Sequence, residues 1–209
     1  MSIGDAEIKT QERVIRFFKD PEILGYQYIG NLSDQQNKNI KEDRLRQYLR
    51  LKGYADKLIA AAVMQLQQEA GNLSRGLYDA NKTVYSRLKY GIPVSESPEK
   101  PPVTVQLIDE EYPQNYDFAI AEEVKVVEQS EKRPDLVVYL NGIAVAVIEL
   151  KRSSISVSEG IRQNLTNQKN SFIQGFFSTM QFCMAGNESE GLRYGTLLNG
   201  EKFYMEWKD

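Results

Sequence analysis

The stretch RPDLVVYLNGIAVAVIELK, Arg133–Lys151, decides the fold of this 209-residue chain. Two apolar, β-rich runs flank Asn141-Gly142, which is the strongest short signal for a β-hairpin. Because side chains alternate between the two faces of a strand, Glu149 and Lys151 share one face at the end of the second run. A buried charge without a partner is costly. This pair therefore lies either beyond the edge of the core or beside a polar site.

Asp135, at the start of the first run, can join Glu149 only if the hairpin is irregular. In a regular two-residue turn, Asp135 would face Ile148 and point to the other side of the sheet. A three-residue loop with Gly142 in the left-handed conformation would instead pair Asp135 with Val147. Asp135 and Glu149 would then be diagonal neighbours on one face, as they would be with a bulge in either strand. We predict one of these irregularities.

The remaining chain divides into a helical first part and a strand-rich second part. Apolar residues recur at helical spacing in Ala6–Lys19, Lys41–Leu51, Asp56–Ala70 and Leu77–Tyr90. A Pro- and Ser-rich break then runs over Gly91–Pro102. Predicted strands follow at Val103–Ile108, Asp117–Glu128, Asp135–Leu140, Ile143–Leu150, Thr179–Ala185, Leu192–Leu198 and Lys202–Trp207, with one helix at Ser158–Phe172. The order predicts an α/β or α+β domain with a mixed sheet, in which 1–92 is the helical part and 103–209 the core.

Composition narrows the chemistry. The chain has no histidine and no GxxxxGK[ST] motif, which excludes His-dependent catalysis and a P-loop for ATP. A catalyst must use carboxylates, Lys or Arg, hydroxyls and amides, and such groups favour a hard cation such as Mg²⁺. The net charge of −3 gives the chain as a whole no electrostatic attraction to nucleic acid, so any such binding must be local or shared with a partner. The single cysteine, Cys183, is expected to be a buried hydrophobe, and with no visible signal peptide or membrane span it fits a cytoplasmic location.

Pro134-Asp135 followed by Glu149-x-Lys151 resembles the PD-(D/E)xK nuclease signature. Together with the hairpin, Gln163, the segment AGNESEGLRYGTL and the leader NKNIKEDRLRQYLRLKGY, it is similar to the N-terminal endonuclease domain of the restriction (HsdR) subunit of type I restriction-modification enzymes. The resemblance covers most of the chain. It implies a restriction-endonuclease-like core, in which a mixed central β-sheet is flanked by helices and preceded by an N-terminal helical segment.

The resemblance also implies Mg²⁺-dependent cleavage of double-stranded DNA. Asp135 and Glu149 would ligate the metal, and the backbone carbonyl of Leu150 would assist. Lys151 would position or deprotonate water, or stabilise charge that builds on the phosphate. Such a cation keeps coordination positions open for water and a phosphate oxygen, as phosphodiester hydrolysis requires.

Helical residues add weaker candidates. Gln163 matches the Gln of the family's Gln-x-x-x-Tyr element, but Asn167 stands at the Tyr position, which leaves the aromatic contribution to DNA binding open. Without the resemblance, Gln163 would be a polar residue on the outer face of an amphipathic helix. Glu12 could supply a further acidic group, although an exposed helix charge explains it as well. The basic candidates for DNA contact are Lys125, Lys151, Arg152, Arg162 and Lys169.

We therefore interpret the chain as the endonuclease domain of a type I site-specific deoxyribonuclease, the restriction subunit. In that family ATP acts in helicase-like domains that translocate DNA, and methyltransferase and specificity subunits are the partners; we expect neither ATP binding nor a membrane contact in this chain. One alternative is a non-catalytic domain that docks onto DNA or subunits. Another is a different PD-(D/E)xK nuclease, such as a repair or junction-resolving enzyme.

Overall fold

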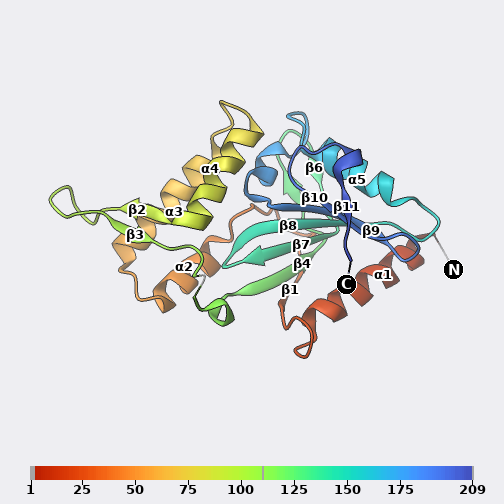
Figure 1. The fold of residues 1–209 in the computed structure, drawn as a ribbon, viewed down its shortest axis with the longest axis horizontal. Coiled ribbons are helices and arrows are strands. Elements are labelled where there is room, and N and C mark those ends of the chain that lie inside the picture. Colours follow the sequence, from red (N-terminus) through yellow and green to blue (C-terminus); the bar gives the residue numbers. More distant parts are fainter. Residues whose placement is uncertain (1–2, 110, 209) are drawn as a thin grey trace.

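A computed structural model describes residues 3–109 and 111–208 of the chain (Figure 1). The α-helices of this part are α1 (Ile3–Lys19), α2 (Glu42–Leu51), α3 (Asp56–Gly71), α4 (Leu77–Tyr90) and α5 (Val157–Asn167). Short 3-10 helices are η1 (Pro113–Asn115), η2 (Gln174–Thr179) and η3 (Glu201–Phe203). In spatial order, the large sheet contains β1 (Gln27–Asn31), β4 (Phe118–Glu122), β7 (Leu136–Leu140), β8 (Ile143–Leu150), β9 (Phe182–Asn187), β10 (Gly191–Gly195) and β11 (Met205–Glu206).

The large sheet is mixed. β1 pairs with β4 and β8 pairs with β9 in parallel, whereas the other neighbours are antiparallel. Parallel β8 and β9 are joined through α5, because parallel neighbours need a crossover rather than a tight turn. The predicted fold class, a mixed central sheet flanked by helices after an N-terminal helix, is confirmed.

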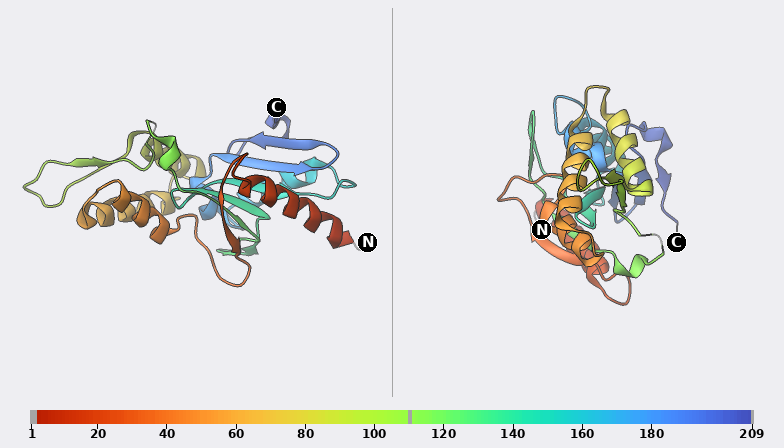
Figure 2. Two further views of the ribbon diagram at one scale, coloured as in Figure 1. Left: turned by 90° about the horizontal axis from the view of Figure 1, so that it is seen from below. Right: turned by 90° about the vertical axis from the view of Figure 1, so that its left-hand side faces the viewer.

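Helices α2, α3 and α4 form a helical lobe together with the hairpin of β2 (Ile92–Val94) and β3 (Val103–Val105). One apolar cluster unites these elements, because Leu45, Leu66, Val84 and Ile92 are all buried in it. The lobe lies at the end of the sheet where β8 begins, as Figure 2 shows from a second side. The break predicted at 91–102 thus runs through a hairpin of the lobe.

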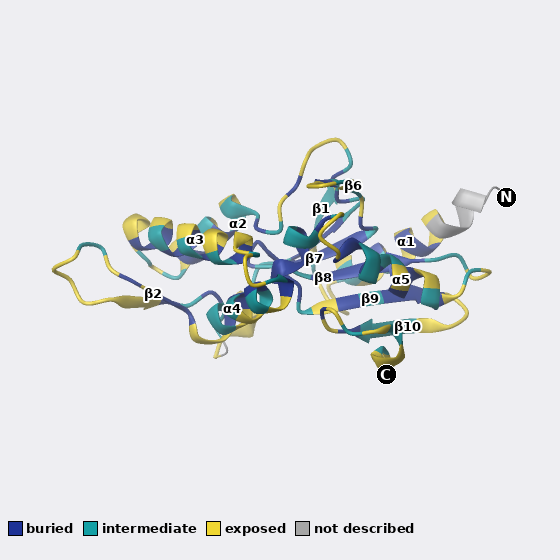
Figure 3. Cartoon of the chain, turned by 90° about the horizontal axis from the view of Figure 1, so that it is seen from above, coloured by how far each residue is buried: buried dark blue, intermediate teal, exposed yellow. Residues whose placement is uncertain are grey.

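The two faces of the sheet are covered by different helices. α1 packs on one face, where Ile15 joins Ile120, Leu136 and Ile148. α5 and η2 cover the other face, with buried side chains that include Phe177. Figure 3 shows the central strands β7, β8 and β9 buried along most of their length.

The turn between β7 and β8 is held against the helical lobe. Asn141 and Gly142 form a two-residue turn with φ angles of 52° and 82°. A Cβ on Gly142 would lie 2.7 Å from the backbone nitrogen of Leu45, so only glycine allows this approach to α2. The buried Asn141 amide also donates to the carbonyl oxygen of Leu107 at 2.9 Å. The hairpin signal in the sequence is therefore a buried connection between sheet and lobe.

Several predicted boundaries were wrong. The strand expected over 117–128 is two strands, β4 and β5 (Val126–Val127), because Glu123 interrupts it with a φ of +50°. β5 pairs instead with β6 (Glu131–Lys132) in a small hairpin. The helix expected over 158–172 ends at Asn167, and the chain then turns so that Phe176 and Phe177 are buried on η2. The strands expected over 103–108, 179–185, 192–198 and 202–207 are also shorter or shifted.

Candidate active site

A β-bulge brings the acidic residues of β7 and β8 into line. Next to the turn, Tyr139 pairs with Ala144, but the next pair is Val138 with Ala146. Val145 is the extra residue of β8 and changes the register by one. The predicted irregularity is confirmed as a bulge, and the three-residue loop does not form.

Beyond the bulge, Asp135 lies opposite Glu149. The last strand pair is Leu136 with Ile148, and the register continues to Asp135 and Glu149. Opposed residues of antiparallel strands point to the same face, so the two carboxyl groups are neighbours. The backbone N–H of Leu150 donates to Oδ2 of Asp135 at 2.6 Å, which fixes the orientation of that carboxyl group.

Glu149 is a buried acid with an incomplete set of partners. Its side chain is 0% exposed, and Oε2 accepts a hydrogen bond from Nε2 of Gln163 at 2.6 Å. Oε1 is buried and has no hydrogen-bond donor. Burial raises the pKa of Glu149 well above its ordinary value, and the neighbouring charge of Asp135 raises that pKa further, whereas Lys151 acts in the opposite direction. A hydrogen bond between the carboxyl groups of Glu149 and Asp135 requires one of them to carry a proton, and the raised pKa of Glu149 favours its protonated form.

α5 presents Gln163 to Glu149 because it packs unusually close to the sheet. The hydroxyl of Ser156 caps the helix by accepting from the N–H of Ser158 at 3.3 Å. At Gly160, an added Cβ would lie 3.0 Å from the Cβ of Ala185 on β9. One turn later, Gln163 is half-buried and bonded to Glu149, so the alternative that placed it on the outer polar face is wrong.

Glu123 is an acidic neighbour that the sequence analysis did not identify. It directly follows β4, and its backbone N–H donates to the carbonyl oxygen of Asp135 at 2.9 Å. Its charge is one of the causes that raise the pKa of Glu149. The signal was available in the sequence FAIAEE, an apolar strand that ends in two acids, but the pairing of that strand with β7 could not be read from it.

Lys151 continues the face of Glu149 at the end of β8. Its side chain is half-buried, and its backbone N–H donates to the carbonyl oxygen of Gly186 at 2.9 Å. Other basic candidates are occupied within the protein: Arg162 pairs with Glu159 and Glu201, at 2.8 and 3.0 Å. Of the other three basic candidates for DNA contact, Lys125 pairs with Glu131, Lys169 is exposed and Arg152 is half-buried.

Two further candidates do not join this group. Asn167 is buried at 2% exposure, and its backbone carbonyl accepts from the N–H of Ile173 at 3.2 Å. Glu12 is exposed on α1, the helix that covers the opposite face of the sheet from Glu149. Glu12 lines a shallow hollow there together with Glu122. The structure therefore supports the reading of Glu12 as a helix charge of the other face.

The donor set suits a hard cation. Asp135 and Glu149 offer carboxylate oxygens side by side. The buried Oε1 of Glu149 has no hydrogen-bond donor, and a cation could interact with it instead. A residue in an extended strand directs its N–H and C=O to the same neighbour, so the carbonyl of Leu150 faces the Asp135 side. No group of three His, Cys, Asp or Glu side chains converges on one point in residues 3–109 and 111–208. The site therefore offers two carboxylates and leaves other coordination positions open.

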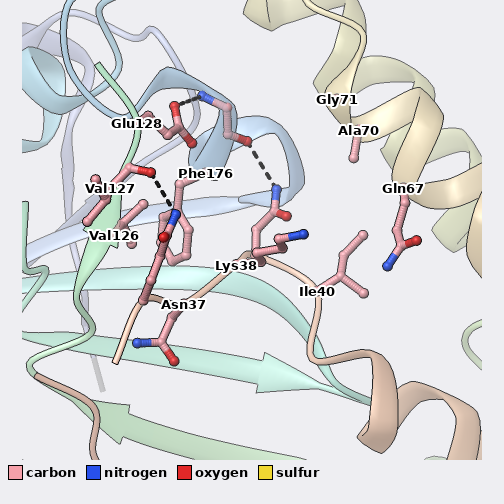
Figure 4. A pocket seen from close by; sticks show the side chains of 13 residues that line it. Asn37, Lys38, Ile40, Gln67, Ala70, Gly71, Val126, Val127, Glu128 and Phe176 are labelled. Atoms are coloured by element: carbon pink, nitrogen blue, oxygen red, sulfur yellow. Dashed lines mark hydrogen bonds between the residues drawn. The ribbon is translucent and has the colours of Figure 1, made fainter. Parts of the chain in front are cut away.

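A pocket elsewhere has a different character. It has a volume of about 350 Å³ and lies between the 36–40 segment, the end of α3, β5 and η2 (Figure 4). Polar groups at its wall already bond within the protein: Asn39 donates to the carbonyl oxygen of Gly175 at 3.1 Å, and Gln36 donates to that of Val127 at 3.0 Å. No buried side-chain atom of its lining, as far as the structure describes it, lacks a partner. The chemistry therefore concentrates at the end of β8.

The mixed sheet, its crossover helix α5 and the acids at the ends of β7 and β8 define a restriction-endonuclease-like fold. The model of the family described as "Type I restriction enzyme R protein N terminus" matches residues 7–203. The chain belongs to this family, and the resemblance found in the sequence is confirmed. No curated protein matches the chain closely enough to count as a relative. Within the described residues, no helix has both the length and the apolar character that crossing a membrane requires.

Proposed function

We propose that this chain is a Mg²⁺-dependent endonuclease domain that hydrolyses phosphodiester bonds of double-stranded DNA. In this proposal it acts within the R subunit of a type I restriction enzyme, which cleaves unmodified foreign DNA after other domains have translocated it with ATP. The observation that carries the proposal is the buried Glu149, whose Oε1 has no donor and whose acidic neighbour is Asp135. Membership of the family supports the setting in a restriction enzyme.

Asp135 and Glu149 would hold the cation, with the carbonyl of Leu150 as a further ligand. When bound, Mg²⁺ polarises a phosphoryl oxygen and lowers the pKa of a water molecule. Gln163 keeps Glu149 in place through its 2.6 Å hydrogen bond to Oε2, so Oε1 stays directed to the cation side. The N–H of Leu150 does the same for Asp135. Backbone and amide donors thus preorganise both carboxylates before DNA arrives.

Lys151 would act on the water or on the phosphate. It extends from the same face as Glu149 and is close enough to affect the pKa of that residue. As an ammonium group, Lys151 would position the water or stabilise the negative charge that grows on the phosphate; only as a neutral amine would it take a proton from the water. DNA and the methyltransferase and specificity subunits are the proposed partners, since the assembled enzyme supplies recognition and translocation.

Cation binding tests the site. Calorimetric titration with Mn²⁺ or Mg²⁺ should detect binding to the wild-type chain, and Asp135→Ala and Glu149→Ala should each abolish it. Glu159→Gln is the matched control, because Glu159 is an exposed acid of α5 that pairs with Arg162. Undiminished binding in both alanine variants would reject the site.

DNA cleavage tests the activity. The full R subunit, assembled with its partner subunits, should cut unmodified plasmid DNA, and Lys151→Ala should remove cutting without affecting assembly or DNA binding. Lys57→Ala changes an exposed lysine at the start of α3 in the helical lobe and should cut normally. If a complex with intact cutting is obtained from Lys151→Ala, the role of Lys151 is wrong. If the wild-type complex binds DNA but never cuts it, the docking alternative is correct.

A further inference from the structure

The outward face of α4 alternates basic and tyrosine side chains. We call this face the α4 stripe, and it consists of Arg75, Tyr78, Lys82, Tyr85 and Lys89. Residues three and four apart lie on one face of a helix, so these spacings place the side chains in one line. Tyr78 is 62% exposed and Tyr85 is 49% exposed, although tyrosine usually packs against other residues. Arg75, just before the helix, has a side chain that is 83% exposed.

The α4 stripe is positive in a chain whose net charge is −3. Lys82 forms no ion pair with any residue in the described part of the chain. The only acid of α4 is Asp79, which pairs with Arg75 at 3.3 Å on the surface. Such an exposed pair contributes little and is easily exchanged for another anion. Arg87 is different, because Glu69 neutralises it within the helical lobe at 2.8 Å.

The surroundings of the acidic site supply little of the attraction that DNA requires. Contacts of Lys and Arg with phosphates provide most of the affinity of a protein for DNA whatever its sequence. Near the site, Arg162 pairs with Glu201 at 3.0 Å and Lys125 pairs with Glu131 at 3.3 Å. A separate basic surface can therefore provide affinity that the residues around the acids do not.

α4 borders the face of the sheet to which Glu149 points. The side-chain amide of Asn81 donates to the carbonyl oxygen of Ser178 at 3.0 Å, which fixes α4 against η2, and η2 covers the same face as α5. Val84 of α4 is buried in one cluster with Ile143, where β8 begins. Glu149 follows about 20 Å further along that strand. One turn of B-DNA is about 34 Å long, so a single duplex can contact α4 and reach the acids within one turn.

We propose that the α4 stripe binds the sugar–phosphate backbone of double-stranded DNA and holds the duplex beside the site at the end of β8. The basic groups neutralise phosphates, and the tyrosine hydroxyls donate to phosphate oxygens. Between Tyr78 and Lys89 the stripe is about 16 Å long, which matches about five base pairs. Contacts to the backbone carry no sequence information, which agrees with a domain whose recognition comes from partner subunits.

DNA binding without divalent cations tests the α4 stripe. The inference rests on the proposed function for its choice of DNA, but not on the cation site. Fluorescence anisotropy with a labelled duplex of about 30 base pairs, three helical turns, gives the affinity as a function of salt. At about 50 mM salt, Arg75→Ala/Lys82→Ala should bind at least about tenfold more weakly, and the slope of log affinity against log salt should decrease by about 1.8, the value for two lost phosphate contacts. Tyr78→Phe/Tyr85→Phe should lose at least about threefold with an unchanged slope, because only neutral donors are removed.

Arg50→Ala/Lys57→Ala is the matched control, since it removes the same two charges elsewhere in the helical lobe. Arg50 forms an exposed ion pair with Asp56, as Arg75 does with its own acidic neighbour, and Lys57 is exposed like Lys82. This control should bind within about twofold of the wild type, because distant surface charges are screened by salt. Circular dichroism checks that each variant is folded.

Unchanged affinity and slope in Arg75→Ala/Lys82→Ala, or an equal loss in the control, would overturn the inference. If the variant binds DNA normally but no longer assembles with the partner subunits, the α4 stripe is a protein interface and the inference is wrong. Cutting by the assembled enzyme separates the two proposals. If the stripe variant binds and cuts like the wild type, only the DNA-binding surface is wrong; if Glu149→Ala cuts normally while the stripe variant loses binding, only the nuclease site is wrong.

Discussion

Replacing Glu149 by glutamine should make the metal-free protein more stable, and increasingly so as the pH rises. Glutamine has nearly the same shape, and its carbonyl can still accept from Gln163 while its amide can donate towards Asp135. In the wild type, burial and the charge of Asp135 raise the pKa of Glu149 above 4.5. The folded protein therefore retains a proton that the unfolded chain has lost, and stability falls as the pH rises above the unfolded pKa.

The size of the effect follows from this linkage. One retained proton lowers the free energy of unfolding by about 1.4 kcal/mol per pH unit, until the pH passes the pKa of Glu149 in the folded state. Between the ordinary pKa and about pH 7.5, the difference between Glu149→Gln and wild type can therefore grow to no more than about 4 kcal/mol. Below the unfolded pKa, the ionisation of Glu149 contributes no difference.

Urea unfolding in the presence of a chelator, measured at several pH values, gives this difference directly. The free energies should diverge with pH while the denaturant dependence stays the same. Glu159→Gln, at an exposed acid of α5, should run parallel to the wild type. Added Mg²⁺ should stabilise the wild type and not Glu149→Gln, because the proposed cation site needs the carboxylate of Glu149. A difference that does not change with pH would refute the placement of Glu149 as a buried, ionisable acid beside Asp135.

Three other results are expected. Gln163→Ala removes the donor to Oε2 of Glu149 and should cost about 1–3 kcal/mol of unfolding free energy in urea; equal stability would mean that this hydrogen bond is absent. Burial raises the pKa of Cys183 to about 12, so an aromatic disulfide reagent at about pH 8 should label the unfolded chain rapidly and the native chain hardly at all; rapid native labelling would contradict the burial. Gly142→Ala should cost at least about 2 kcal/mol through its φ of +82° and its contact with the start of α2, whereas Gly200→Ala, with no atom within 4 Å, should change stability by less than about 0.5 kcal/mol; similar effects of the two would refute the close packing of the turn.

The hairpin and its acids could be predicted because their signals are local. Asn141-Gly142 fixes the turn, and alternation along β8 fixes the face of Glu149. The requirement that Asp135 reach that face then predicted an irregular register. Which irregularity occurs could not be read from the chain, because Val145 becomes the bulged residue through packing against the lobe and the α1 side at once.

Features that depend on long-range packing could not be predicted from local periodicity for the same reason. Glu123 lies beside Asp135 only because β4 pairs with β7, and the sequence does not state that pairing. Gln163 looks like an outer-face residue on a helical wheel, yet Gly160 lets α5 approach β9 closely enough to turn it to Glu149. The end of α5 at Asn167 depends on the burial of η2. In each case, tertiary packing overrides what local periodicity indicates.

The most direct test of the central claim is the anomalous X-ray scattering of Mn²⁺ in a crystal of this domain. The account predicts an anomalous peak between the carboxylates of Asp135 and Glu149, at coordination distance from both, that disappears in Glu149→Ala. A manganese-soaked crystal that binds ions elsewhere, with no peak between these two side chains, would contradict it.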